Sequence, residues 1–347
     1  MKSLDRNDIE ALDMYIRTSD RITVAVHIHP DGDAIGSAVA MLGYLSGLGR
    51  DAAVVLPDPH PSALGFLIEQ AGKKVYTYSE AKEETEGRLL SSDLVICQDF
   101  NSFSRTGDLE NVLRSAAGKK VLIDHHLDPD TECFDICFSE TGVSSTAELL
   151  YYILMEMPGI RHDARKLPAI SAAALMTGMT TDTNNFANSV FPTTLDMASA
   201  LLDAGVDRDL IIDKVFNSYK ETRIRLMGYL LDRCLTITGD GVAYMILGRK
   251  TIMKFGIQDG DTEGFVNIPL AISNVRMSIF LKQDKDRFRV SIRSKKGTSA
   301  NRCAREYFNG GGHELASGGK LMIPDDVKGI KDAAAYIEKV THIFFSR

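Results

Sequence analysis

Short runs of apolar and β-branched residues alternate with helix-like segments through the first half of the chain, and this alternation limits the fold more than any other feature. The runs predicted to be strands are RITVAVHI (21–28), DAAVVLP (51–57), LVICQDF (94–100) and KKVLIDHH (119–126). The predicted helices are 33–50, 144–157 and 165–182, with a capping box between Ser145 and Glu148. Strands separated by helices favour a parallel, doubly wound sheet of the α/β class.

The pattern changes after residue 191. Residues 192–235 have a helical pattern without strands, and the segments 242–248, 277–283 and 287–295 then have the pattern of strands in a smaller, mixed α+β domain. We therefore predict a domain over 1–190, a helical connector over 191–238 and a second domain over 239–347.

The 347-residue chain lacks the features of a secreted or membrane protein. Its first ten residues, MKSLDRNDIE, include acids and no apolar core of a signal peptide. No apolar run reaches the roughly 18–20 residues of a membrane span. The five cysteines are scattered, which is typical of free thiols in a reducing compartment. We expect a cytoplasmic protein that does not bind a membrane.

Charge is distributed unevenly along the chain. Residues 241–347 contain 18 Lys and Arg against 11 Asp and Glu, a net of +7, so residues 1–240 have a net of −14. An acidic part suits metal ions and a basic part suits an anionic substrate, although two unrelated solvated surfaces would give the same totals.

Carboxylates and imidazoles follow several of the predicted strands. His27, Asp31 and Asp33 come after the first strand, Asp99 after LVIC, and Asp124-His125-His126 after KKVLI, while Asp182 ends a predicted helix. Ligands of open α/β sheets bind beyond the carboxyl ends of the strands. We therefore expect these side chains to lie close together, although each alone would be an ordinary loop residue or helix cap.

Four neighbouring aspartates would repel one another unless cations offset their charge. Two divalent ions supply that charge, and a pair of metals can activate water and clamp a phosphoryl group. Mixed imidazole and carboxylate ligands without cysteine suit Mn²⁺ best, with Co²⁺, Fe²⁺ or Zn²⁺ as alternatives.

The second domain contains a glycine-rich segment, FNGGGHELASGG (308–319). Gly310, Gly311 and Gly312 would let backbone N–H groups approach an anion, with His313 beside them. Upstream, Arg293 offers a bidentate fork for phosphate next to Ser294. A glycine-rich turn capped by a structural histidine is the alternative interpretation.

Together, the motifs HIHPDGDAIGS, QDF, DHH, TGMTTDTNNF and GGGHELASG resemble the DHH phosphoesterase superfamily, subfamily 1, with a type-1 DHH-associated domain. The resemblance implies an active site in the cleft between the two domains. It implies that His27 and Asp31 bind one Mn²⁺, that Asp33, His125 and Asp182 bind a second, and that Asp99 bridges both. It assigns His126 and Asp124 as catalytic groups, with Asp124 orienting a histidine. It also assigns a set of substrate contacts, which are Arg293, Ser294, Gly310, Gly311, Gly312, His313 and Arg105. Asn184-Asn185 departs from the family pattern, which has a glycine before the phenylalanine.

Within this superfamily the chain is similar to bifunctional oligoribonucleases that also dephosphorylate 3′-phosphoadenosine-5′-phosphate (pAp). The resemblance therefore implies an Mn²⁺-dependent phosphohydrolase of short 5′-phosphorylated RNA or nucleotides. Alternatives are a phosphodiesterase of cyclic di-AMP or linear pApA, an exopolyphosphatase, and a nucleotide sensor without activity. The sequence has no long basic groove or tail, so we expect no binding of long nucleic acid. Helices over 192–235 could pair two subunits in a homodimer.

Overall fold

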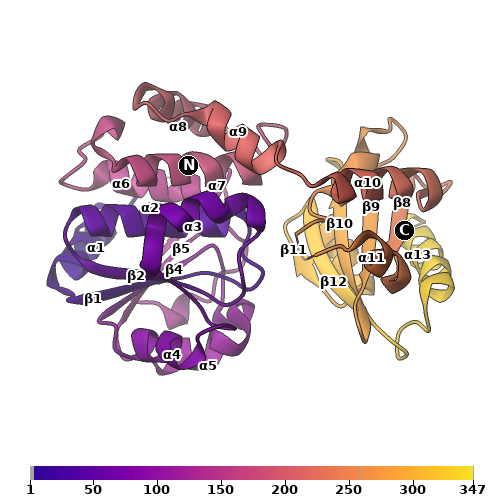
Figure 1. Cartoon of the computed structure of the whole chain (residues 1–347), viewed down its shortest axis with the longest axis horizontal. Helices are drawn as coiled ribbons and strands as arrows, with labels where there is room; N and C mark the ends of the chain where they lie inside the picture. The colour runs from indigo at the N-terminus through magenta and orange to yellow at the C-terminus, as the bar shows by residue number, and fades with distance from the viewer. Residues whose placement is uncertain (1–3, 259, 347) are drawn as a thin grey trace. The chain divides into compact units, whose positions relative to one another are not determined.

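The computed structural model describes residues 4–258 and 260–346, which form two compact units, Met1–Ser218 and Tyr219–Arg347 (Figure 1). We call them the N-terminal unit and the C-terminal unit. The division falls inside the segment predicted as a connector. Two of its helices, α8 (Pro192–Asp203) and α9 (Arg208–Phe216), belong to the N-terminal unit, and α10 (Glu221–Arg233) belongs to the C-terminal unit.

The N-terminal unit is built on a six-stranded sheet in the order β3-β2-β1-β4-β5-β6, in which every neighbouring pair is parallel. The strands are β1 (Arg21–Ala25), β2 (Asp51–Leu56), β3 (Val75–Thr77), β4 (Leu94–Gln98), β5 (Lys119–Asp124) and β6 (Ile136–Ser139). The strand order reverses between β1 and β4, so the carboxyl ends of β1, β4 and β5 are neighbours at the switch point. This topology confirms the predicted doubly wound, parallel sheet.

Helices cover both faces of this sheet (Figure 1). The larger core lies on the face covered by α1 (Arg6–Thr18), α2 (Gly32–Gly47), α3 (Gly65–Ala71), α6 (Thr146–Glu156) and α7 (Ala169–Asp182). The opposite face packs against α4 (Lys82–Leu90) and α5 (Glu110–Ser115). Strands buried on both faces read as continuous apolar runs, which explains the LVIC and VLI segments of the sequence.

The C-terminal unit contains a second six-stranded sheet, in the order β11-β12-β10-β9-β8-β7. It is mixed, because β8 and β9 are parallel whereas the other neighbouring strands are antiparallel. The strands are β7 (Thr236–Ile237), β8 (Val242–Leu247), β9 (Met277–Gln283), β10 (Arg287–Ser294), β11 (Gly311–Gly312) and β12 (Ala316–Met322).

Side chains of the C-terminal sheet alternate between two apolar clusters. One face packs against α12 (Ala300–Tyr307) and α13 (Ile330–Phe345), and the other packs against α10 and, at its margin, α11 (Arg249–Phe255). Among the described residues, no helix is both long enough and apolar enough to cross a membrane.

Candidate active site

Three neighbouring strands of the N-terminal sheet end in the predicted site residues. His27 lies two residues beyond β1, Asp99 follows β4 directly, and Asp124 is the last residue of β5. Because β1, β4 and β5 are hydrogen-bonded side by side, these three strand ends bring the polar side chains to one edge of the sheet. Asp99 has a backbone φ of 63°, a left-handed conformation that is uncommon outside glycine.

The Asp99 carboxylate faces two histidines with its two oxygen atoms. Its Oδ2 lies 3.4 Å from Nε2 of His27, and its Oδ1 lies 3.7 Å from Nε2 of His125. The other ring nitrogen of His27, Nδ1, is 2.7 Å from the Ile28 carbonyl oxygen. That carbonyl accepts a hydrogen bond and so places the proton on Nδ1, which leaves Nε2 of His27 directed toward Asp99 with its lone pair.

The remaining carboxylates come from two helix ends. Asp31 caps α2 by accepting hydrogen bonds from the amides of Asp33 and Ala34, at 3.0 and 3.1 Å. Asp33 lies in the first turn of α2, with Oδ2 3.8 Å from Nε2 of His125. Asp182 ends α7, with Oδ2 3.6 Å from the same nitrogen.

Six of the potential ligands therefore gather in two neighbouring groups. One group contains His27, Asp31 and Asp99, and the other contains Asp33, His125 and Asp182. Within each group the ligand atoms lie within 4.8 Å of one another. The short distance from Asp99 to His125 joins the two groups into one cluster.

Asp124 orients His126. Its Oδ1 lies 2.7 Å from Nδ1 of His126, and its Oδ2 accepts a bond of 3.2 Å from the His126 amide. The Asp124 side chain is fully buried, and His126 is 9% exposed. The ring of His126 is therefore held in one orientation.

Burial and mutual repulsion shift the pKa values of this cluster. Desolvation, followed by repulsion from neighbouring aspartates, raises the pKa of Asp33 and of Asp99 well above the ordinary value. Burial also lowers the pKa of His27 and of His125. Desolvation opposes ionisation of Asp31, but His27 and two backbone amides outweigh it, so the pKa of Asp31 is lowered. Neutral imidazoles suit cation binding, and a bound cation would favour the ionised form of the crowded carboxylates.

The donor set fits divalent cations. It combines imidazole nitrogen with carboxylate oxygen and lacks thiolate among the described residues near it, which is the chemistry of Mn²⁺, Co²⁺, Fe²⁺ or Zn²⁺ rather than of an iron–sulfur site. Positive charges at the cluster would offset the repulsion that raises the pKa values of Asp33 and Asp99.

Arg105 contributes positive charge to the same edge. It lies in a 3₁₀ helix, η3 (Phe103–Leu109), and its carbonyl accepts a bond of 2.9 Å from the Ile28 amide. The Arg105 guanidinium is among the causes that lower the pKa of His27 and His125, and it partly opposes the rise in the pKa of Asp99. The nearby His29 donates its amide to Asp58 Oδ2 at 2.8 Å.

The predicted substrate residues of the C-terminal unit lie at one end of its sheet. Arg293 pairs with Ser278 of β9 and with Ala316 of β12, and its Nη1 donates to the Ile292 carbonyl at 3.0 Å. The Ser294 hydroxyl donates to the Thr298 carbonyl at 2.6 Å, so its hydrogen is already used within the fold.

The glycine-rich segment forms a tight hairpin. Gly311 and Gly312 pair with β12, and a Cβ atom on Gly310 would lie 1.9 Å from the Gly318 carbonyl oxygen. His313 begins the turn, with its amide donating to the Ala316 carbonyl at 2.8 Å. Close packing of two strands therefore requires glycine at position 310 even without a bound anion.

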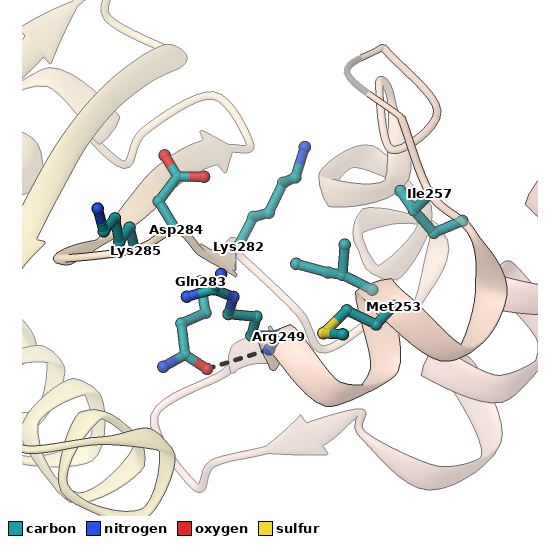
Figure 2. Close-up of a pocket in the computed structure, with 8 residues that line it drawn as sticks. Arg249, Met253, Ile257, Lys282, Gln283, Asp284 and Lys285 are labelled. Atoms are coloured by element: carbon teal, nitrogen blue, oxygen red, sulfur yellow. Dashed lines mark hydrogen bonds between the residues drawn. The ribbon is translucent and has the colours of Figure 1, made fainter.

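A pocket of about 330 Å³ in the C-terminal unit contains none of the predicted site residues (Figure 2). It lies between α11 and the end of β9, where the Arg249 amide donates to Gln283 Oε1 at 3.1 Å. Met277, the opposite end of β9, pairs with Ser294. The pocket and the predicted phosphate contacts thus occupy opposite ends of one strand.

The sequence analysis missed the residues that hold Asp33 and Asp99 in place. Thr146 and Ala147, at the start of α6, donate hydrogen bonds to these two carboxylates. The predicted capping box is half right: the Glu148 amide donates to Ser145 Oγ at 3.0 Å, but the Glu148 carboxylate accepts from Ser144 instead of Ser145. The Ser-Ser-Thr sequence at the start of α6 was the signal that could have pointed to these hydrogen-bond donors.

The departure at Asn184-Asn185 gives a left-handed turn after Asp182. Asn184, Asn185 and Phe186 have φ values of 46°, 58° and 64°. Asparagine tolerates this region better than most residues, and Arg208 hydrogen-bonds Asn185 and stacks over the Phe186 ring at 5.3 Å.

The fold and these side chains define an α/β protein with a histidine–carboxylate site at the switch point of a parallel sheet. The model of the DHH family, N-terminal domain, matches residues 21–179, and the model of the DHHA1 domain matches residues 239–339. The chain belongs to the DHH family. The resemblance noted from the motifs is thereby confirmed.

Three proteins illustrate the similarity. The chain is 29% identical over 313 residues to the bifunctional oligoribonuclease and PAP phosphatase NrnA of Bacillus subtilis, covering 88% of this chain and 91% of that relative. It is 28% identical over 204 residues to the cyclic-di-AMP phosphodiesterase GdpP of Bacillus subtilis, covering 58% of this chain and 30% of that relative. The crystal structure of an exopolyphosphatase-related protein from Bacteroides fragilis has a TM-score of 0.91 and 32% identity, covering 100% of this chain and 98% of that chain.

Proposed function

We propose that this protein is a two-metal phosphohydrolase, dependent on Mn²⁺, that degrades short 5′-phosphorylated oligoribonucleotides and removes a phosphate from pAp. The observation that carries the proposal is the Asp99 carboxylate, whose two oxygen atoms face His27 and His125 separately, at 3.4 and 3.7 Å. A carboxylate with one oxygen toward each histidine could contact both cations of a two-metal site. The similarity to NrnA over 88% of the chain supports the substrate class.

In this proposal, His27 and Asp31 hold one cation, Asp33, His125 and Asp182 hold the other, and Asp99 contacts both. When bound, such cations supply charge that stabilises a phosphoryl group under attack and lowers the pKa of water. His27 is prepared for this role because its Nδ1 is bonded to the Ile28 carbonyl, which leaves Nε2 as the ligand atom.

His126 would contact the substrate. The Asp124 carboxylate accepts from Nδ1, so Nε2 would be the ring atom that contacts the substrate, and it would have to carry a proton to donate to a phosphate or leaving-group oxygen. Fixing the ring in this way removes the rotational freedom that a catalytic histidine would otherwise lose on substrate binding. Arg105 would add positive charge for the phosphate.

Arg293, Ser294 and the Gly310–His313 loop would bind the far phosphate or nucleotide. Arg293 is the strongest candidate, because its planar guanidinium can bind a terminal phosphate with two hydrogen bonds. Ser294 is 6% exposed and its hydroxyl donates to the Thr298 carbonyl, so it would donate to a phosphate only by exchanging that bond. Contacts to a far phosphate or nucleotide would favour short substrates that carry such a group.

A second candidate function is hydrolysis of cyclic di-AMP or linear pApA, which the similarity to GdpP over 204 residues favours. Hydrolysis of polyphosphate is a third, in view of the exopolyphosphatase-related structure. A nucleotide sensor without activity is disfavoured, because all six of the expected metal ligands are present in the sequence.

The test is a competition assay with Mn²⁺ in which pAp, 5′-phosphorylated di- to pentanucleotides, cyclic di-AMP, pApA and a polyphosphate chain-length series are supplied to the same protein. We expect pAp and the di- to pentanucleotides to be turned over fastest. Faster turnover of cyclic di-AMP or polyphosphate would replace the proposal with the corresponding alternative. Absence of turnover of every substrate would favour the sensor.

A further inference from the structure

The start of helix α6 makes three hydrogen bonds to two of the proposed metal ligands. The amides of Thr146 and Ala147 donate to Asp33 Oδ2 and Oδ1, at 2.6 and 2.9 Å. The Thr146 hydroxyl donates to Asp99 Oδ1 at 3.0 Å. Thr146, Asp33 and Asp99 are at most 2% exposed, so water does not compete for these bonds.

The Thr146 hydroxyl donates to only one of the two Asp99 carboxylate oxygens, Oδ1. Oδ1 is the atom near His125, and Oδ2 is the atom near His27. A donor fixed at Oδ1 sets the rotation of the carboxylate about its Cβ–Cγ bond, so both oxygens keep their separate directions. Backbone strain at Asp99, with φ at 63°, makes such external support more important.

The segment that precedes Thr146 is held by a buried glutamate. The Glu148 carboxylate is fully buried and accepts from the Ser144 amide at 2.9 Å, from the Ser144 hydroxyl at 2.5 Å, and from the hydroxyls of Thr193 and Thr194 at 2.6 and 2.7 Å. These bonds join the residue before the α6 cap to the first turn of α8. The start of α6 is therefore fixed from two directions, and Thr146 has little freedom to follow a displaced Asp99.

We propose that Thr146 is a positioning residue that sets the orientation of the Asp99 carboxylate and thereby the affinity of the site for its cations. The inference rests on the proposed function for the identity of those cations. The orientation of the Asp99 carboxylate, which one hydroxyl sets, does not depend on a bound cation.

Thr146→Val removes the hydroxyl while keeping the branched shape, and Thr146→Ser restores it. Outer hydrogen-bond partners of metal ligands typically change affinity by about 10–100-fold. We expect calorimetric titration with Mn²⁺ to show roughly that loss for Thr146→Val, with recovery to within about threefold of wild type for Thr146→Ser. Thr85→Val is the matched control, because Thr85 is also fully buried but its hydroxyl bonds the Ala81 carbonyl of its own helix at 2.7 Å.

Wild-type Mn²⁺ affinity in Thr146→Val would overturn the inference, as would equal losses in the valine and serine variants, which would indicate packing instead of a hydrogen bond. A crystal structure of metal-free Thr146→Val gives a second test that does not depend on metal binding. We expect the Asp99 carboxylate to rotate away from the orientation that joins His27 and His125. An unchanged carboxylate would overturn the inference, whether or not the wild-type protein binds Mn²⁺. Absence of Mn²⁺ binding by the wild-type protein would instead refute the proposed function.

Discussion

Nδ1 of His126 lies 2.7 Å from Oδ1 of Asp124, and the Asp124 carboxylate also accepts from the His126 amide. His125 instead directs Nε2 toward Asp33, Asp99 and Asp182, at 3.6–3.8 Å. Two neighbouring histidines at one strand end therefore have different surroundings, and we expect them to have different roles.

His125→Ala should weaken Mn²⁺ binding, because it removes an imidazole nitrogen from the group with Asp33 and Asp182. His126→Ala should retain Mn²⁺ but slow turnover by about 10²–10⁴-fold, as expected for a group that moves a proton in the transition state. Calorimetric titration with Mn²⁺ and steady-state kinetics on pAp measure the two effects. Equal loss of Mn²⁺ affinity in both variants would contradict the division of roles.

Asp99→Ala should abolish most activity, because it removes the carboxylate that faces both histidines. EDTA should likewise abolish hydrolysis by the wild-type protein, and Mn²⁺ should restore it better than Mg²⁺, which prefers oxygen ligands. The measurement is pAp turnover after EDTA treatment and addition of each metal. A wild-type rate in Asp99→Ala would refute the shared-carboxylate assignment.

Arg293→Ala should reduce turnover of pAp and of phosphorylated dinucleotides by roughly 10–100-fold. A bidentate, charge-assisted contact to phosphate is worth about 1.5–3 kcal/mol, and about 1.4 kcal/mol corresponds to a factor of ten. The small ester bis-p-nitrophenyl phosphate has no far phosphate, so its hydrolysis should hardly change. The measurement is kcat/KM for each substrate.

Arg289→Ala is the matched control for this experiment. Arg289 lies on the same strand and the same face as Arg293, about 13 Å away at 3.3 Å per residue, and it binds Asp284 at 2.6 Å. Its removal should leave all three rates near wild type. If Arg293→Ala lowered the rates for bis-p-nitrophenyl phosphate and pAp equally, Arg293 would support the fold rather than the substrate.

Gly36→Ala should destabilise the N-terminal unit by about 1–3 kcal/mol, the usual cost of overpacking. An added Cβ would lie 2.7 Å from both the Ala174 carbonyl oxygen and the Gly178 amide nitrogen, and these backbone atoms of α7 cannot move aside easily. Gly87→Ala is the control, because nothing lies within 4 Å of its added Cβ on the exposed side of α4. It should stabilise the protein by about 0.4–1 kcal/mol. Urea unfolding of both variants checks the opposite signs, and a neutral Gly36→Ala would contradict the close helix contact.

Much of the fold could be predicted because each strand is marked by residues that are adjacent in the sequence. The LVIC and VLI runs are continuous and apolar, as strands buried on both faces must be, and the polar residues that follow them mark where the strands end. Parallel pairing then brings Asp99 and Asp124 to one edge without any knowledge of the register.

The support of the site could not be predicted, because it depends on contacts between segments far apart in sequence. Thr146 meets Asp33 across 113 positions and Asp99 across 47. A capping pattern identifies Ser145 as a helix start but does not reveal which carboxylate the free amides of that helix will meet. The Glu148 carboxylate departs from the predicted capping box because two threonine hydroxyls of α8 compete for it.

The central position of β1, β4 and β5 in the N-terminal sheet has a consequence for amide hydrogen exchange. Each of these strands is hydrogen-bonded on both sides, whereas β3 and β6 are the edges. Amides in the centre of such a sheet exchange mainly when the whole unit opens, whereas edge strands fray at lower free energy. The strands that lead to His27, Asp99 and Asp124 should thus exchange more slowly than β3 and β6, and this part of the candidate site should persist when the edges open.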